Sequence, residues 1–460
     1  MVQTLKEAEA AAPTTRTSGA GLNRDVVEEL VRRRGEPEWL RAIRLEALAA
    51  YERLPVPTQQ TEGWRRTSLA GLRLDAHHAL PTLPADQAAT GAAIDGQASL
   101  PELAHAAGVL VQRDGRTVAA DGLAGLAERG VVLMDLAEAS RHPQFGERVR
   151  ERFAQTIPVD RDIFTALHYA FFNAGVFVYV PRGVVLEQPL WTTHVFGEPG
   201  LAALSHTLLI VEGGAQATYV DDYSAPPRGD APVASGVVEQ TLGRQANVRY
   251  VNLQRWATDV WSFSAQRAHL AADASLRTLN VALGARLART SVQAVLEGRG
   301  SQADVLGIVA ADGRQHVDFQ TLQDHYGNGT RSDLVIYNAL RGRSSSNFTG
   351  LIVINKPAHG TESSQQQKNV LLSAQARADS DPKLEILNND VVRCTHGASV
   401  GPVDPEMLFY LQSRGVSHEG AERLIVEGFF QSVLEKMQQP GLHAAVWSAV
   451  EQKLPVGSTE

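Results

Sequence analysis

Apolar residues recur with two different spacings along the 460-residue chain, and the changes between them divide it into segments. From residue 24 the spacing is that of an amphipathic helix, with positions i, i+1, i+4 and i+5 occupied by Val26, Val27, Leu30 and Val31. Pro55 and Pro57 end this first helical run, and helical spacing returns over residues 120–170. We therefore predict a disordered, Ala-, Thr- and Gly-rich lead-in over residues 1–23 and an N-terminal helical region over residues 24–170.

Short β-branched runs replace the helical spacing near Gly175 and continue to about residue 402. Gly, Asp and Asn residues separate these runs, as they do between strands, and examples are Leu208–Val211, Val248–Val251 and Leu351–Ile354. No convincing helical segment of about ten or more residues interrupts them. The pattern predicts an all-β domain over residues 171–402.

Small residues in similar sequence contexts recur through this β region, at Ala217, Ala246, Ala274, Ala303 and Ser332. Their consecutive spacings are 29, 28, 29 and 29 residues. A period of about 20–50 residues is typical of solenoids and propellers. Because the region lacks helices, the spacing favours a parallel β-helix. A β-sandwich is the alternative, although sandwich strands do not usually keep so constant a period.

Helical spacing returns beyond Pro402. Asp404 followed by Pro405 is typical of a helix start, Gly415 of a helix end, and Ser417 of a second start, so we predict a helical hairpin within a C-terminal helical domain over residues 403–460. The hairpin contains many apolar residues for its length, so either it folds back on its own β domain or it docks a partner. The apolar residues concerned are Met407, Leu408, Tyr410, Leu411, Leu424, Ile425, Phe429 and Phe430.

Composition narrows the classes of function. A single cysteine excludes an intramolecular disulfide framework, and also a zinc finger, a CxxC redox pair or a four-cysteine iron–sulfur site built from this chain alone. The formal net charge of −8 argues against nucleic-acid binding by bulk electrostatics. The chain has no secretory signal and no apolar run of about 18 residues, so we expect a cytoplasmic protein without a membrane span.

Several catalytic motifs are absent or lack their structural setting. The chain has no P-loop, no GxGxxG before a helix and no HExxH, which argues against ATP hydrolysis, a Rossmann site and the commonest zinc hydrolases. Gly397–Gly401 matches the GxSxG of α/β-hydrolases, but it lies in the β-rich region rather than in a strand–turn–helix. A carbohydrate-cleaving β-helix would need clustered carboxylates. Here they are scattered, and we expect most of them at turns: Asp221, Asp222, Asp304, Asp318, Asp379, Asp381 and Asp390.

The one thiol lies two residues from a histidine, in Cys394-Thr-His396. In an extended strand, residues i and i+2 point to the same side, so both side chains could face one ligand. Thiolate and imidazole suit iron, copper and zinc, but closed zinc and iron–sulfur sites need about four ligands. If this pair is a site, another chain must complete it. The alternative is a buried structural cysteine beside a surface histidine.

The segment Ser380–Gly401, which ends in Cys394-Thr-His396-Gly-Ala-Ser-Val-Gly, closely resembles the SufB/SufD family of iron–sulfur cluster assembly scaffolds. The C-x-H-G-A-x-V-G form, and the lack of cysteines between Gly175 and Arg393, resemble the SufD branch rather than SufB, whose extra cysteines carry persulfide sulfur. The resemblance runs from about residue 36 to 436. Further matching segments are Leu54–Pro57, Glu62–Thr67, Gly175–Val185, Gln367–Ser373, Met407–Gly415 and Ala421–Phe430.

The resemblance implies a non-catalytic scaffold subunit, built from an N-terminal helical region, a right-handed parallel β-helix and a C-terminal helical region. It implies a heterodimer with a SufB-like subunit, and an ABC-type ATPase, SufC, that supplies the missing P-loop. Self-association of the chain is the alternative assembly when SufB is absent. Nothing in the resemblance implies a nucleic-acid or membrane partner.

The resemblance also assigns roles to residues. His396, with Cys394 beside it, would contribute to a nascent iron–sulfur cluster that is shared transiently with SufB. The hairpin from Asp404 to Met437, with the eight apolar residues named above, would dock SufC. A flavin accompanies the family's complex in some members, and no motif here predicts its site.

Overall fold

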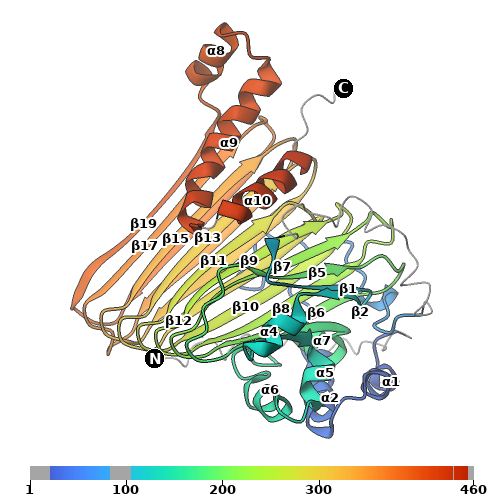
Figure 1. The fold of residues 1–460 in the computed structure, drawn as a ribbon. Helices are drawn as coiled ribbons and strands as arrows, with labels where there is room; N and C mark the ends of the chain where they lie inside the picture. The colour runs from blue at the N-terminus through green and yellow to red at the C-terminus, as the bar shows by residue number, and fades with distance from the viewer. Residues whose placement is uncertain (1–20, 83–104, 439, 454–460) are drawn as a thin grey trace.

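The computed structural model describes residues 21–82, 105–438 and 440–453 (Figure 1). Strands from two sheets alternate along the chain, and each strand from β4 onward pairs in parallel with the strand two places later. This is the topology of a parallel β-solenoid, so the predicted β-helix is confirmed. The alternative of a β-sandwich is excluded, because sandwich sheets are antiparallel.

Within the described residues, one sheet has ten strands and the other has nine. The ten-stranded sheet, here called the odd sheet, consists in spatial order of β19 (Val391–Pro402), β17 (Thr361–Leu371), β15 (Arg331–Leu340), β13 (Gln302–Ala311), β11 (Ser275–Ala282), β9 (Asn247–Trp256), β7 (Gln216–Ala225), β5 (Leu190–Val195), β1 (Gly108–Arg113) and β2 (Arg116–Asp121). The nine-stranded even sheet consists of β18 (Arg377–Ile386), β16 (Ser345–Ile354), β14 (His316–His325), β12 (Leu287–Leu296), β10 (Trp261–Leu270), β8 (Val233–Leu242), β6 (Ala203–Val211), β4 (Ala174–Val180) and β3 (Val132–Asp135).

The pairing register confirms some of the predicted repeat positions and corrects others. Residues in register down one inward-facing column of the odd sheet are Ala217, Val248, Leu276, Ala303, Ser332, Ser363 and Cys394. Coil length along this column therefore varies from 27 to 31 residues. Ala246 and Ala274 lie two residues before the column, so those two markers were misassigned. Turns of different length shift the small residues, whereas backbone hydrogen bonds fix the column.

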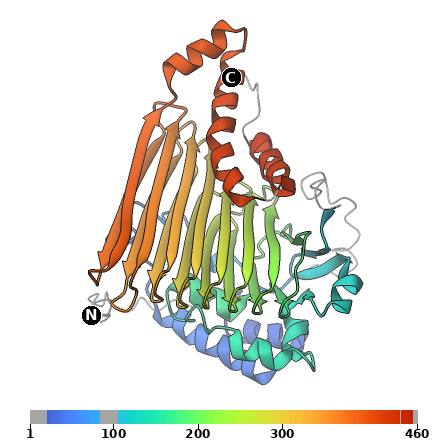
Figure 2. The same cartoon turned by 60° about the vertical axis from the view of Figure 1, so that its left-hand side comes forward.

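The N-terminal helices cover the outer face of the even sheet at its first coils (Figure 2). Within residues 21–23, the side chain of Leu22 is buried and Asn23 caps the first helix, while residues 1–20 of the predicted lead-in lie outside the described residues. Aromatic rings fill the contact between helices and sheet, including Phe153, Tyr169 and Phe172. These helices are α1 (Arg24–Arg34), α2 (Glu38–Arg53), α5 (Leu136–Arg141), α6 (Gly146–Arg152) and α7 (Ile163–Phe171), and a short 3₁₀ turn lies at Leu74–Ala76.

Both sheets begin upstream of Gly175, inside the region predicted to be helical. Strand β1 pairs in parallel with β5, and β3 pairs antiparallel with β4, so Leu133 lies in a strand rather than in a helix. A six-residue helix, α4 (Leu123–Glu128), separates these strands. Short apolar runs do not distinguish a strand from a buried helical turn, which is why the periodicity misled here.

In the part of the chain that the structure describes, three helices follow the solenoid: α8 (Pro405–Ser413), α9 (His418–Met437) and α10 (Pro440–Lys453). The predicted caps are confirmed: Asp404 accepts from the Glu406 amide, and Ser417 accepts from the Gly420 amide. Helices α9 and α10 pack on the outer face of the odd sheet, and α8 extends beyond the strand ends (Figures 1 and 2). None of the helices in the described residues is long and apolar enough to cross a membrane.

Candidate functional site

The solenoid ends in an open coil formed by β18 and β19, each of which is the edge strand of its sheet (Figure 2). Cys394 and His396 lie on β19 in register with Ser363 and Gln365 of β17, whose side chains are buried between the sheets. Both site residues are thus on the inward-facing side of β19, as the spacing of two predicted. Because no further coil of the described chain stacks on β19, His396 is exposed to solvent.

Cys394 is half-buried and packs against a small apolar cluster that includes Ile352, Ile354 and Leu384. Burial raises the pKa of its thiol, because desolvation disfavours the thiolate. The thiol is therefore mostly protonated and a weak nucleophile at neutral pH. His396, in contrast, is exposed to solvent, so its imidazole is the more accessible of the two side chains.

The interior beside these residues is polar rather than apolar. Gln365 and Gln367 of β17 are 3% and 2% exposed, and the Oε1 of Gln365 and the Nε2 of Gln367 have no hydrogen-bond partner among the described residues. Ser380 of β18 donates to Gln367 across the coil. In the described part of the chain, no three or more His, Cys, Asp or Glu side chains are grouped so that they could hold a metal ion.

The open coil also exposes apolar side chains. Val392 is 66% exposed, and Val400, Ile386 and Leu387 are between 41% and 47% exposed. Long unpaired edge strands that carry apolar side chains are normally covered or paired, because their free backbone groups attract other strands. The end coil therefore has the properties of an interface.

The eight apolar residues predicted for docking divide into two groups. One group, on α8 and the start of α9, is exposed or half-buried, and the other, Phe429 and Phe430, packs on the odd sheet. Met407, Tyr410 and Leu424 are 49%, 56% and 47% exposed, and Leu408, Leu411 and Ile425 are half-buried. Phe430 is fully buried against the odd sheet, so as the chain stands it belongs to the core. Phe429 is half-buried and stacks on Tyr337 of β15, with ring centroids 4.6 Å apart. Phe429 and Phe430 therefore fold back on the β domain, whereas docking of a partner by the exposed residues stays a prediction.

Phe409 is the apolar residue of α8 that the sequence argument missed, and it is 72% exposed. It lies off the stripe of Leu408 and Leu411, so a search for one amphipathic face passes over it. The sequence feature that indicates an exposed residue here is the unbroken apolar run Met407–Leu411, because a single buried helix face cannot include all of its side chains.

Comparison with protein families shows the family to which the chain belongs. The family model described as the SUF system FeS cluster assembly SufBD core domain matches residues 194–429, which is more than half of the chain. A second model, the SufBD protein N-terminal region, matches residues 27–191. The chain belongs to the SufBD family.

Curated SufBD relatives match nearly the whole chain. The iron-sulfur cluster assembly protein SufD of Bacillus subtilis is 29% identical over 426 residues, which cover 91% of this chain and 95% of the relative. An iron-sulfur cluster assembly SufBD family protein of Staphylococcus epidermidis is 28% identical over 429 residues, with 91% and 90% covered. This chain is therefore a SufBD family protein of iron–sulfur cluster assembly.

The matching segment Glu62–Thr67 crosses the outer face of the even sheet and is anchored there by two buried residues. Thr67 donates to the Oδ2 of Asp318 at 2.5 Å, and the guanidinium of Arg289 lies 3.9 Å from the ring centroid of Trp64. Arg289 also pairs with Asp318. In this part of the SufBD chain, the segment thus ties the N-terminal region to the later coils.

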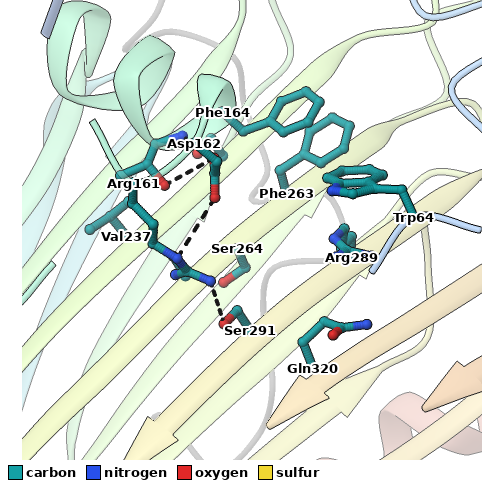
Figure 3. Close-up of a pocket in the computed structure, with 13 residues that line it drawn as sticks. Trp64, Arg161, Asp162, Phe164, Val237, Phe263, Ser264, Arg289, Ser291 and Gln320 are labelled. Atoms are coloured by element: carbon teal, nitrogen blue, oxygen red, sulfur yellow. Dashed lines mark hydrogen bonds and ion pairs between the residues drawn. The ribbon is translucent and has the colours of Figure 1, made fainter. Parts of the chain in front are cut away.

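A cavity of about 70 Å³ lies beside Trp64, under the stacked rings of Phe164 and Phe263, whose centroids are 3.6 Å apart (Figure 3). Arg161 lines it, donates to the Oγ of Ser291 at 2.7 Å and lies 3.8 Å from a carboxylate oxygen of Asp162. Cofactor pockets have volumes of roughly 300–1,000 Å³. This cavity does not fit a flavin, and we assign no role in flavin binding to it.

The scattered carboxylates were expected to lie mainly at turns, and this prediction is wrong. Six of the seven lie within strands, and Asp221, Asp222 and Asp318 are fully buried, where they accept hydrogen bonds or pair with arginine. Ser399 of the GxSxG match lies in the middle of β19, in extended backbone rather than at a strand–helix turn. Ser399 therefore lacks the strand–turn–helix setting of a GxSxG nucleophile.

Proposed function

We propose that this SufBD protein is a SufD-like scaffold subunit that pairs, through its end coil, with a SufB-like subunit and docks a SufC-type ATPase. The observation that carries the proposal is the open end coil, where exposed His396 lies on an unpaired edge strand among exposed apolar side chains. A partner with a similar open coil would cover these side chains and satisfy the edge backbone groups. The name of the Bacillus subtilis relative supports the SufD assignment.

The substrate of this interface is the nascent iron–sulfur cluster. His396 offers an accessible imidazole, whereas the thiol of Cys394 is half-buried and mostly protonated. Because a cluster needs about four ligands, the SufB-like partner must supply most of them. The chain contributes a ligand and a surface rather than a complete active site, so it acts as a scaffold subunit.

Docking of the ATPase is assigned to α8 and the first turns of α9. Met407, Phe409, Tyr410 and Leu424 form an exposed apolar surface there, rich in the aromatic residues that anchor protein interfaces. ATP binding to the docked subunit would shift α8 and α9 only if the two nucleotide states make different contacts with them. Hydrolysis itself belongs to the partner, and no flavin step is included.

The test is co-expression of the chain with SufB-like and SufC-like subunits, followed by mass measurement of the intact complex. His396→Ala should leave the complex assembled, because the side chain is exposed, but lower its iron and acid-labile sulfide content and its visible absorbance. Cys394→Ser should have the smaller effect. Normal cluster content in His396→Ala, or a wild-type chain that binds neither partner, would contradict the proposal.

A further inference from the structure

A single column of polar residues crosses the outer face of the odd sheet and ends at the candidate site. Its members are paired in register through five successive ladders, one residue from each strand of the odd sheet from β9 to β19. They are Arg249, Arg277, Asp304, Asp333, Ser364 and Thr395. The last of them, Thr395, lies between Cys394 and His396 in the sequence.

The C-terminal end of α9 is bound to three members of this column. Arg249 donates to the carbonyl of Met437 at 3.1 Å, and Arg277 donates to the side chain of Gln438 at 3.1 Å. The Nζ of Lys436 donates to the Oδ2 of Asp333 at 3.0 Å. Cationic donors at a helix C-terminus also complement its dipole, so the helix end has a defined place on the sheet.

Asp333 continues the contact toward the open coil. Its second carboxylate oxygen, Oδ1, accepts a hydrogen bond from the Oγ of Ser364, and Ser364 is directly opposite Thr395 on β19. Residues of both strands and Lys436 line a groove of about 610 Å³ that also includes His396. In the described residues, no hydrogen bond joins α9 directly to β17 or β19, so a displacement of the end of α9 would reach these two strands through Asp333 and Ser364.

We infer that Asp333 and Ser364 are positioning residues that couple α9 to the strand that carries Cys394 and His396. The side chains of Lys436 and Asp333 are 45% and 22% exposed, so their ion pair contributes little to stability on its own. The carboxylate of Asp333 is bonded both to Lys436 of α9 and to Ser364 of β17. A movement of α9 can therefore be transmitted to β17 through this one side chain. This inference rests on the proposed function, because it takes α8 and α9 as the docking element and β19 as the site.

Cys394, the only thiol of the chain, reports on this coupling. In the complex with the SufB-like and SufC-like subunits, the alkylation rate of the Cys394 peptide is measured by mass spectrometry with iodoacetamide, with and without a non-hydrolysable ATP analogue. We expect the nucleotide to change the wild-type rate by about fivefold or more, which is the lower range of allosteric couplings. Asp333→Asn and Ser364→Ala should bring this ratio close to one while the ATPase stays bound.

Matched control variants distinguish a loss of coupling from a general loss of structure. Glu362→Gln removes a carboxylate from the same face of β17, where no hydrogen bond to α9 is formed, and should keep the wild-type ratio. Lys436→Arg preserves the ion pair and should also keep it, whereas Lys436→Met should not. A wild-type ratio in Asp333→Asn overturns the inference, as does a wild-type complex that binds the ATPase but shows no response. A wild-type chain that fails to bind the ATPase overturns the proposed function instead.

Discussion

Truncating two phenylalanines of the C-terminal hairpin should have opposite consequences. Phe430 is 0% exposed and lies in an apolar cluster with Val335 and Tyr337 of β15, whereas Phe409 is 72% exposed on α8. A buried phenylalanine removes roughly 150–250 Å² from water, which at ~25 cal/mol per Å² corresponds to about 4–6 kcal/mol as an upper bound. Since alanine keeps part of this area, Phe430→Ala should cost about 3–5 kcal/mol. Phe409→Ala should change stability by less than about 0.5 kcal/mol.

Hydrogen exchange is the suitable assay, because a long stack of coils need not unfold in one cooperative step. At about 1.4 kcal/mol for each factor of ten, Phe430→Ala should accelerate exchange of the α9 amides by roughly two to four orders of magnitude. The inner strands of the solenoid should keep their protection. Phe409→Ala should leave α9 protection unchanged and instead weaken ATPase binding by about tenfold or more, as for an interface anchor.

Equal protection of α9 in Phe430→Ala and in the wild type would refute the packing of α9 on the odd sheet. If Phe409→Ala exposed α9 as much as Phe430→Ala does, the division of the hairpin into a buried and a docking part would fail.

Two further perturbations test the core and the N-terminal segment. Burial lowers the pKa of His325 to about 4, and its ring nitrogens bond Thr330 and Ser332 at 2.8 Å. The unfolded state, with a pKa near 6.5, takes up the proton first on acidification, so stability is lost as the pH falls from above 6.5 toward 4. Between pH 7 and pH 5 this site should cost about 2 kcal/mol, and His325→Gln should flatten the pH dependence of the denaturation midpoint. Asp318→Asn should weaken the anchor of Thr67 and destabilise the protein by about 3–5 kcal/mol, as expected for a broken buried ion pair. Limited proteolysis should then cut within residues 58–66 faster than in the wild type, and an unchanged rate would count against the anchor.

The sequence alone determined much of this architecture because its signals are local. The change from helical spacing to β-branched runs near Gly175, the caps at Asp404 and Ser417, and a repeat of about 29 residues depend on neighbours along the chain. The same is true of the pair Cys394 and His396, since residues two apart in a strand must share a side. The family followed from motifs that are also continuous in sequence.

Tertiary structure decided what depends on residues far apart in the chain. Coils of 27 to 31 residues set the register, which placed Ala246 outside the column that contains Ala217 and brought Asp333, Ser364 and Thr395 into one row. No periodicity in the sequence distinguishes Phe430, buried between α9 and the odd sheet, from Phe409, exposed on α8, because both occur in short apolar runs. The single cysteine likewise shows only that a shared site needs a partner. It is the end of the stack, where no further coil of the described chain covers β19, that leaves His396 open to one.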